Sequence, residues 1–173
     1  MRILHVITSL RIGGAEKLMV DLLPRMKAGG DVVELCVFDG VKTPFYEELE
    51  RKGIVIHALG NSVYSLLNIL KLISLIRKYD IVHTHNTACQ YYVAIASCFV
   101  PSRLFTTEHN TDNRRRRNLF WKIMDKWMYG RYESVICISE ETKENLLRHL
   151  YGDKNIQTKK YKVIYNGQNS EQT

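Results

Sequence analysis

Short apolar runs alternate with longer amphipathic segments along the whole chain. Seven runs rich in β-branched residues are too short for helices and predict buried parallel strands, at residues 3–7, 32–38, 54–58, 80–86, 103–107, 134–138 and 161–165. Between them, apolar residues recur at helical spacing. This alternation predicts an α/β fold: a Rossmann-like three-layer domain with a parallel sheet of six to seven strands, helices on both faces, and strand order 3-2-1-4-5-6.

Several predicted helices carry start signals. Thr43 and Ser139 can act as N-caps, and Asp112–Asn113 can cap a long helix that ends near Arg131. Ser62 or Ser65 can start the next predicted helix, which extends to about residue 76. That helix shows a wide apolar stripe, formed by Leu66, Leu67, Ile69, Leu70, Ile73 and Ile76. The helix after residue 112 has a predicted buried face, formed by Leu119, Phe120, Ile123, Met124, Trp127 and Met128.

The first predicted strand leads into a glycine loop and then a helix. Residues 3–17 read ILHVITSLRIGGAEK, with Gly13–Gly14 directly before the helical periodicity. A helix N-terminus exposes unpaired N–H groups and the positive end of the helix dipole, and glycine lets a ligand approach the backbone closely. The loop therefore fits an anion such as phosphate. A tight turn explains the glycines equally well, because neither G-x-G-x-x-G nor a P-loop is present.

Polar residues follow the predicted strands at their carboxyl ends. They are Thr8–Ser9, His85–Asn86, Thr107–His109 and Ser139–Glu140. In an open parallel sheet, ligands bind beyond these ends, at the switch between the first and fourth strands. We therefore expect a ligand crevice along this edge.

Three histidines near that edge are candidates for chemistry. His83 and His85 share one face of a strand, so they could bind a metal, but no third ligand and no Asp-x-Asp is evident. A structural pair, with His83 packed and His85 hydrogen-bonded near the crevice, is the alternative, and we expect no metal. His109 follows the fifth strand and can donate to a sugar hydroxyl or a developing negative charge. A surface-loop histidine is the other interpretation.

Four consecutive arginines stand at a predicted helix N-terminus: Arg114, Arg115, Arg116 and Arg117. The helix dipole disfavours each positive charge there by ~0.3–1 kcal/mol at an exposed site. The run is either a solvated charge cluster or a clamp for phosphates or acidic lipid headgroups, with Phe120, Trp121 and Trp127 nearby. No nucleic-acid motif is recognisable, so we expect no nucleic-acid partner.

Composition adds broader limits. The chain has 173 residues, which fits one domain at residues 1–165 with a tail at 166–173, and its net charge of +7 favours anionic partners. No secretory leader and no run long enough to cross a bilayer is apparent. No C-x-x-C pair occurs, so buried free thiols in a reducing cytosol are expected for Cys36, Cys89, Cys98 and Cys137.

These segments together resemble a known family. The glycine stretch, followed by GGDVVELCVF, DIVHTHN, RLFTTEHN, SVICIS and VIYNG, resembles the N-terminal half of retaining family 4 glycosyltransferases of the GT-B type, and the resemblance covers the whole chain. In that family two Rossmann-like domains face each other across a cleft. The N-terminal domain mainly binds the acceptor, and the C-terminal domain holds the nucleotide sugar and carries an E-x₇-E motif.

The resemblance implies roles for particular residues. Gly13 and Gly14 match the glycine loop near the donor phosphates and the acceptor. His109 matches a histidine that contacts the donor sugar near the reacting centre, which makes it the catalytic candidate. His85 and Asn86 match a strand exit with a less defined role in substrate binding. The family requires neither metal nor cofactor, which agrees with the missing Asp-x-Asp.

The chain ends at Thr173, before any nucleotide-binding domain of the family pattern. We therefore expect the acceptor half of a nucleotide-sugar-dependent transferase for cell-surface glycan or glycolipid synthesis, inactive alone. It would act in the cytoplasm on a sugar or lipid-linked acceptor, at the inner face of the membrane if the arginine run binds lipid. A non-catalytic module that binds a glycan or anionic lipid is the alternative. A third interpretation is an unrelated Rossmann-type nucleotide or cofactor enzyme, which is disfavoured because the dinucleotide-binding fingerprint is absent.

Overall fold

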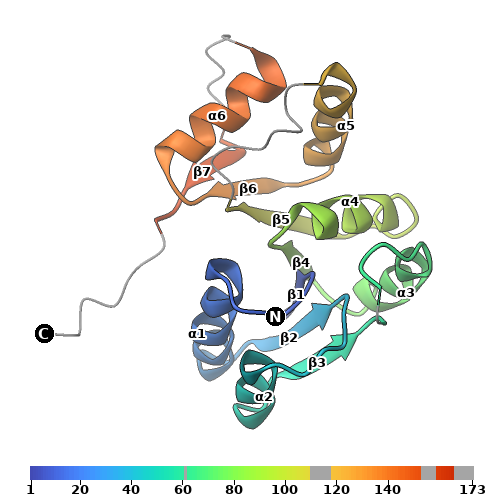
Figure 1. Ribbon diagram of the computed structural model, residues 1–173, viewed down its shortest axis with the longest axis vertical. Helices are drawn as coiled ribbons and strands as arrows, with labels where there is room; N and C mark the ends of the chain where they lie inside the picture. Colours follow the sequence, from blue (N-terminus) through green and yellow to red (C-terminus); the bar gives the residue numbers. More distant parts are fainter. Residues whose placement is uncertain (61, 110–117, 153–158, 166–173) are drawn as a thin grey trace, which may run out of the picture.

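A computed structural model describes residues 1–60, 62–109, 118–152 and 159–165. The elements follow the predicted alternation of strands and helices (Figure 1). In chain order they are β1 (Arg2–Ile7), α1 (Gly14–Ala28), β2 (Val32–Val37), α2 (Pro44–Arg51), β3 (Val55–Ala58), α3 (Leu67–Ile76), β4 (Ile81–Thr84), α4 (Thr87–Ala96), β5 (Arg103–Glu108), α5 (Leu119–Gly130), β6 (Ser134–Cys137), α6 (Glu140–Tyr151) and β7 (Tyr161–Val163).

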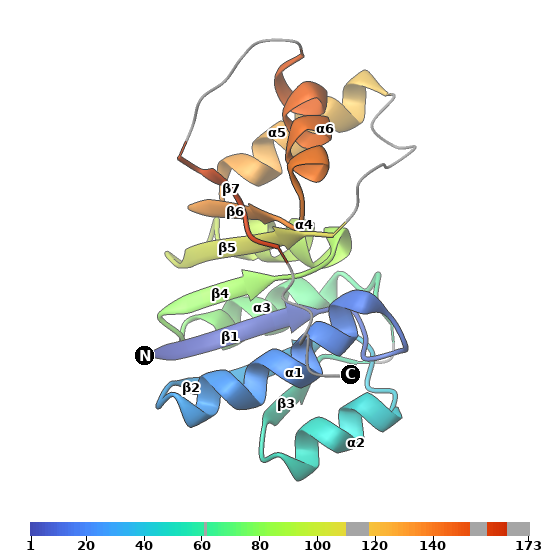
Figure 2. The same cartoon turned by 90° about the vertical axis from the view of Figure 1, so that its left-hand side faces the viewer.

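The described strands form one seven-stranded sheet in the order β3-β2-β1-β4-β5-β6-β7. Every neighbouring pair is parallel. Figure 2 shows the strands stacked one above another with β1 near the middle. The predicted Rossmann-like fold and the order 3-2-1-4-5-6 are therefore confirmed, and the last strand is added outside β6.

The sheet separates two hydrophobic cores because successive side chains of a strand point to opposite faces. On β1, Leu4 and Val6 pack with residues of α3, α4, α5 and α6, whereas Ile7 packs with residues of α1 and α2. All three side chains are fully buried. Burying each of them contributes roughly 1.5–3 kcal/mol. This central strand therefore joins both layers of helices to the sheet.

Two of the predicted helix starts are confirmed by hydrogen bonds. Thr43 Oγ1 accepts from the N–H of Tyr46, and Pro44 occupies the first turn of α2. Ser139 Oγ accepts from the N–H of Thr142 at the start of α6. Each such cap satisfies a donor that the helix leaves unpaired and stabilises the helix by ~1 kcal/mol.

Two other predicted starts are wrong. Helix α3 begins at Leu67 rather than at a serine, and Leu66 at its N-cap makes no side-chain capping bond. Helix α5 begins at Leu119, because Asn118 is in an extended conformation and its side chain accepts from the N–H of Phe120. The predicted cap Asp112–Asn113 lies outside the described residues.

The apolar stripes of α3 and α5 are largely exposed, contrary to the prediction for α5. Six side chains are 59–77% exposed: Leu66, Leu67, Leu70, Leu119, Phe120 and Ile123. The buried face of α5 is instead set by Asp125, Met128 and Tyr129. Asp125 is held there by hydrogen bonds from Tyr91 and His149.

Among the described residues, no helix combines the length and the hydropathy needed to cross a membrane. The tail at 166–173 lies outside them, so the domain boundary at residue 165 remains a prediction.

The four cysteines carry thiols rather than disulfides, as predicted, but they differ in exposure. Cys36, Cys89 and Cys137 are buried, and burial raises the pKa of the Cys36 and Cys89 thiols. Cys98 is exposed, so the expectation that it is buried is wrong. It lies beyond the end of α4 at Ala96.

We expect a thiol reagent to modify one cysteine per chain, Cys98, in the native protein and all four after denaturation under non-reducing conditions. A buried thiol is both inaccessible and protonated, so it does not react. Reagent titration with mass spectrometry of the modified peptides measures both counts. Fewer than four reactive thiols in denaturant would show a disulfide and contradict the assignment.

Candidate functional site

The candidate site lies at the carboxyl ends of β1 and β4. These strands are neighbours at the sheet's switch point, where β1 leads to helices on one face and β4 to helices on the other. Just beyond them, the N–H of Thr8 donates to Asn86 Oδ1 at 3.0 Å. This bond ties the two predicted polar exits together and fixes the start of α4, for which Asn86 is the N-cap residue.

The glycine loop leads into the N-terminus of α1 at the same edge. The backbone of Gly13 is extended, so its conformation does not require glycine. A Cβ added to Gly14 would meet no atom within 4 Å, so the space beside this residue is open. A Cβ on Gly13 would instead meet the carboxylate of Glu16 in the first turn. The anion position at this loop stays a prediction from the sequence.

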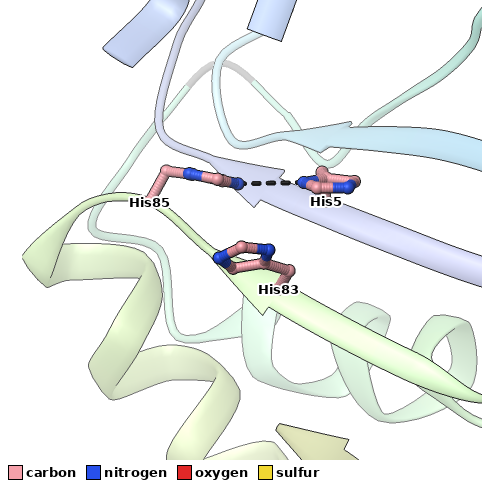
Figure 3. A group of neighbouring side chains, drawn as sticks. All are labelled: His5, His83 and His85. Atoms are coloured by element: carbon pink, nitrogen blue, oxygen red, sulfur yellow. Dashed lines mark hydrogen bonds between the residues drawn. The ribbon is translucent and has the colours of Figure 1, made fainter. Parts of the chain in front are cut away.

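A cluster of three histidines lies beside this edge, and one of them was missed in the sequence. His5 Nδ1 and His85 Nε2 are 2.9 Å apart and share a hydrogen bond (Figure 3). His83 lies beside both rings and bonds Thr107 Oγ1 at 2.8 Å. His5 is in register with His83 across the β1–β4 pair. The predicted strand order together with the period of two along β1 could have revealed this neighbour.

Burial keeps these imidazoles neutral. It is the largest cause that lowers the pKa of His5, His83 and His85, and the neighbouring histidines lower it further. For His83 the pKa falls to about 4. Neutral rings can each donate one hydrogen bond and accept another, so the cluster is a polar but uncharged surface at neutral pH.

His109 follows β5 and extends the cluster beyond His85. Its ring centre is 6.0 Å from that of His85, it is half-buried, and burial lowers its pKa. In the described part of the chain, three buried ring nitrogens lack a partner: His5 Nε2, His85 Nδ1 and His109 Nε2. Buried polar atoms are normally satisfied, so these nitrogens mark where polar atoms of a ligand or water would bind.

The same histidines are the described residues best placed to hold a cation. His5, His83 and His85 each offer one ligand atom within 4.8 Å of the others. The sequence prediction of no metal rested on a missing third ligand, and His5 supplies it. However, the hydrogen bond between His5 and His85 already uses one nitrogen of each ring. No carboxylate or thiolate joins the group among the described residues.

The structure therefore brings most of the predicted site residues to one edge of the sheet. His85, Asn86 and His109 are grouped, and Gly13 and Gly14 open α1 at the carboxyl end of the adjacent strand β1.

The predicted anion-binding run consists of Arg114, Arg115, Arg116 and Arg117. These residues lie outside the part of the chain that the structure describes. The described chain resumes at Asn118, directly before α5. The role of the run therefore stays a prediction from the sequence.

Comparison with known proteins gives a consistent family assignment. The family model described as Glycosyltransferase Family 4 matches residues 12–172. The capsular polysaccharide biosynthesis glycosyltransferase CapH of Staphylococcus aureus is 25% identical over 175 residues, which cover 96% of this chain and 47% of CapH.

Solved structures show the same fold. Anabaena HepE in complex with UDP and glucose matches with a TM-score of 0.76 and 21% identity, over 96% of this chain and 44% of HepE. A glycosyltransferase from Rickettsia africae matches with a TM-score of 0.74 and 23% identity, over 96% of this chain and 43% of that protein. The chain thus spans less than half the length of these relatives.

We expect Asn86→Ala to lower the free energy of unfolding by ~1–2 kcal/mol, because it leaves the N–H of Thr8 without its acceptor. Asn86→Asp keeps the acceptor oxygen and a good N-cap residue, so it serves as the matched control. Urea denaturation followed by circular dichroism measures both. Equal stability of Asn86→Ala and wild type would show that this bond does not hold the two strand ends together.

Proposed function

The chain belongs to glycosyltransferase family 4, and from this premise we propose that it is the acceptor-side half of a nucleotide-sugar-dependent transferase in cell-surface glycan or glycolipid synthesis. The observation that carries the proposal is the family match over residues 12–172, on a chain that covers less than half of its relatives. Residues 1–165 are the proposed domain, and 166–173 begin the connection to a nucleotide-binding half.

A nucleotide sugar as donor is supported by the relatives. HepE has been crystallised with UDP and with UDP-glucose, and CapH is named for capsular polysaccharide synthesis. The acceptor is a sugar or a lipid-linked sugar, and the location is cytoplasmic. We further propose transfer with retention of anomeric configuration and without a metal, as the resemblance to retaining family 4 glycosyltransferases implies.

The described residues have the chemistry that such a transfer needs from its acceptor side. When the glycosidic bond breaks, negative charge develops on the leaving phosphate. In this proposal the N–H groups at the start of α1, beside the open position of Gly14, stabilise that charge. His109 Nε2 offers a buried, unpartnered nitrogen for a hydroxyl of the donor sugar. His85 and Asn86 line the same edge and orient the substrate.

A non-catalytic module that binds a glycan or an anionic lipid is the second candidate. The three unpartnered histidine nitrogens favour it as much as they favour catalysis, because they fit any ligand with several hydroxyl groups. A module would bind its ligand without a second domain, whereas the transferase half needs one to hold the nucleotide and exclude water.

One experiment separates these functions. The 173-residue chain is assayed with UDP-sugars in EDTA, alone and as part of a complete enzyme in which it is followed by a family nucleotide-binding domain. We expect no turnover by the chain alone and transfer by the complete enzyme. Robust transfer by the isolated chain would overturn the half-enzyme assignment, and a complete enzyme without activity would favour the binding module.

In the complete enzyme, His109→Ala should lower kcat by roughly 10²–10³-fold, because a preorganised hydrogen bond to the reacting sugar is lost. The free energy of unfolding should change little, since Nε2 of His109 has no partner among the described residues. Steady-state kinetics and urea denaturation measure the two effects. An unchanged kcat would remove His109 from the site.

Gly14→Ala is expected to separate stability from donor binding. The backbone of Gly14 does not require a positive φ, so alanine should leave the stability unchanged or raise it by up to ~1 kcal/mol. The added methyl group occupies the open space proposed for the phosphate, and KM for the donor should rise about tenfold or more. A Gly14→Ala enzyme with unchanged KM would place the phosphate elsewhere.

We also propose that the run of Arg114, Arg115, Arg116 and Arg117 binds anionic lipid headgroups. Reversal of the four charges should weaken binding to phosphatidylglycerol vesicles at low salt and have little effect at high salt, because exposed charges are screened. Vesicle co-sedimentation at both salt concentrations measures this. Equal binding of the variant and wild type at low salt would leave the run as a solvated charge cluster.

A further inference from the structure

Three histidines from two neighbouring strands meet at one point beside the candidate site. His5 of β1, and His83 and His85 in and just after β4, each place a ring nitrogen within 4.8 Å of the other two. His5 is in register with His83 across the parallel pair, and side chains two residues apart share one face of a strand. Figure 3 shows the His83 ring beside the hydrogen bond that joins His5 to His85. The strand pairing therefore sets the spacing of the three rings.

Packing alone does not account for the cluster. His5 and His85 are both 1% exposed, and their outer nitrogens, His5 Nε2 and His85 Nδ1, have no partner among the described residues. An unpaired buried polar atom costs free energy. Ile3 and Ile7, on either side of His5 on the same face of β1, are buried without such a cost. Three imidazoles at one point therefore indicate a ligand.

We propose that His5, His83 and His85 together bind one divalent transition-metal ion, with Zn²⁺ the ion that best suits these ligands. Imidazole nitrogen is a preferred ligand of zinc, whereas Mg²⁺ and Ca²⁺ require oxygen ligands. No carboxylate or thiolate joins the group among the described residues. Three histidines leave the fourth position of a tetrahedral zinc ion open for water.

The observed spacing needs small side-chain adjustments to hold this ion. Zinc bonds imidazole nitrogen at about 2.0–2.1 Å, so two ligand nitrogens of a tetrahedral site lie about 3.3 Å apart. His5 Nδ1 and His85 Nε2 are 2.9 Å apart and must separate by a few tenths of an ångström. His83 bonds Thr107 through Nε2, which leaves its Nδ1 to approach the ion. Rotation of the rings achieves this while the strands stay paired.

The hydrogen bond between His5 and His85 does not prevent binding. Two neutral imidazoles share one proton across this bond. When an ion takes both nitrogens, the ring that donated moves its proton to its own outer nitrogen. Those outer atoms are the unpartnered His5 Nε2 and His85 Nδ1. Both rings therefore stay neutral, and each keeps one N–H group.

The surroundings of His83 supply two further requirements of a metal site. Thr107 Oγ1 lies 2.8 Å from His83 Nε2 and fixes the orientation of the ring, as partners of metal-bound histidines commonly do. His83 is partly exposed, whereas His5 and His85 are buried. An ion can therefore enter from the side of His83.

A bound ion would cross-link the two central strands. His5 and His85 are 80 residues apart in the sequence. Because the unfolded chain does not hold the three rings together, the ion should stabilise the folded state. This metal site is separate from the transfer reaction, which we propose to proceed in EDTA, and it depends on neither a sugar nor a second domain.

Cobalt titration of the 173-residue chain tests the site directly. The chain is stripped with EDTA, the EDTA is removed, and Cys98, the exposed thiol, is first alkylated so that it cannot bind metal. We expect one Co²⁺ per chain, with the strong visible absorption of tetrahedral coordination, and displacement by Zn²⁺ but not by Mg²⁺. Zn²⁺ should also raise Tm. Absence of saturable binding, or an octahedral spectrum, would overturn the proposal.

Single substitutions identify the ligands. His83→Gln and His5→Gln should each weaken Zn²⁺ binding about tenfold or more and abolish the rise in Tm, because one ligand is lost. His57→Gln is the matched control, since His57 lies on β3 and pairs with Glu34 outside the cluster. It should bind like wild type. Loss of binding in His57→Gln alone would place the ion at Glu34 and His57 and contradict the site.

Nuclear magnetic resonance of the wild-type chain needs no variant and so covers the case in which His5→Gln, at a buried position, does not fold. Each bound ring keeps one N–H group, so paramagnetic Co²⁺ should give three strongly shifted imidazole N–H signals. Fewer than three such signals would show that the histidines do not bind the ion together. Neither measurement uses a sugar, so a failed transferase assay would leave this result unaffected.

Discussion

The parallel pairing of β1 with β4 is the contact on which the candidate site depends. Ile3 pairs with Ile81 and His5 with His83, so the two strands end at the same edge of the sheet. Their connections then leave toward opposite faces. The strand exits at Thr8–Ser9 and His85–Asn86 therefore lie side by side although they are far apart in the sequence, and the bond from Thr8 to Asn86 joins them.

Desolvation determines what this edge can do chemically. Four histidines lie together, and burial keeps the pKa of each below its usual value. A cluster of charged imidazoles would repel a cation and attract phosphate by charge alone. The neutral cluster instead presents directional donors and acceptors, which suits hydroxyl groups, and leaves the backbone at the start of α1 to bind charge.

Much of the fold follows from the sequence because apolar residues recur with different periods in strands and in helices. The crossovers between parallel strands are also almost always right-handed, which limits the possible strand orders. The sequence alone was enough to predict the helix caps at Thr43 and Ser139 and the order of the central strands. The predicted buried face of α5 was wrong because it left out a buried polar residue. Asp125 turns inward to Tyr91 and His149, so α5 exposes Phe120 and Ile123 rather than burying them. His5 was missed because its partners come from β4, which is far away in the sequence, and the predicted strand order was not used to compare the two strands.

The most direct test of this account is a crystal structure of the complete enzyme with a nucleotide sugar bound. We expect the diphosphate within hydrogen-bond distance of the N–H groups at the start of α1 near Gly14, and a hydroxyl of the sugar on His109 Nε2. The acceptor should occupy the edge formed by His85 and Asn86. A donor bound without contact to the carboxyl edge of β1 and β4 would contradict the site.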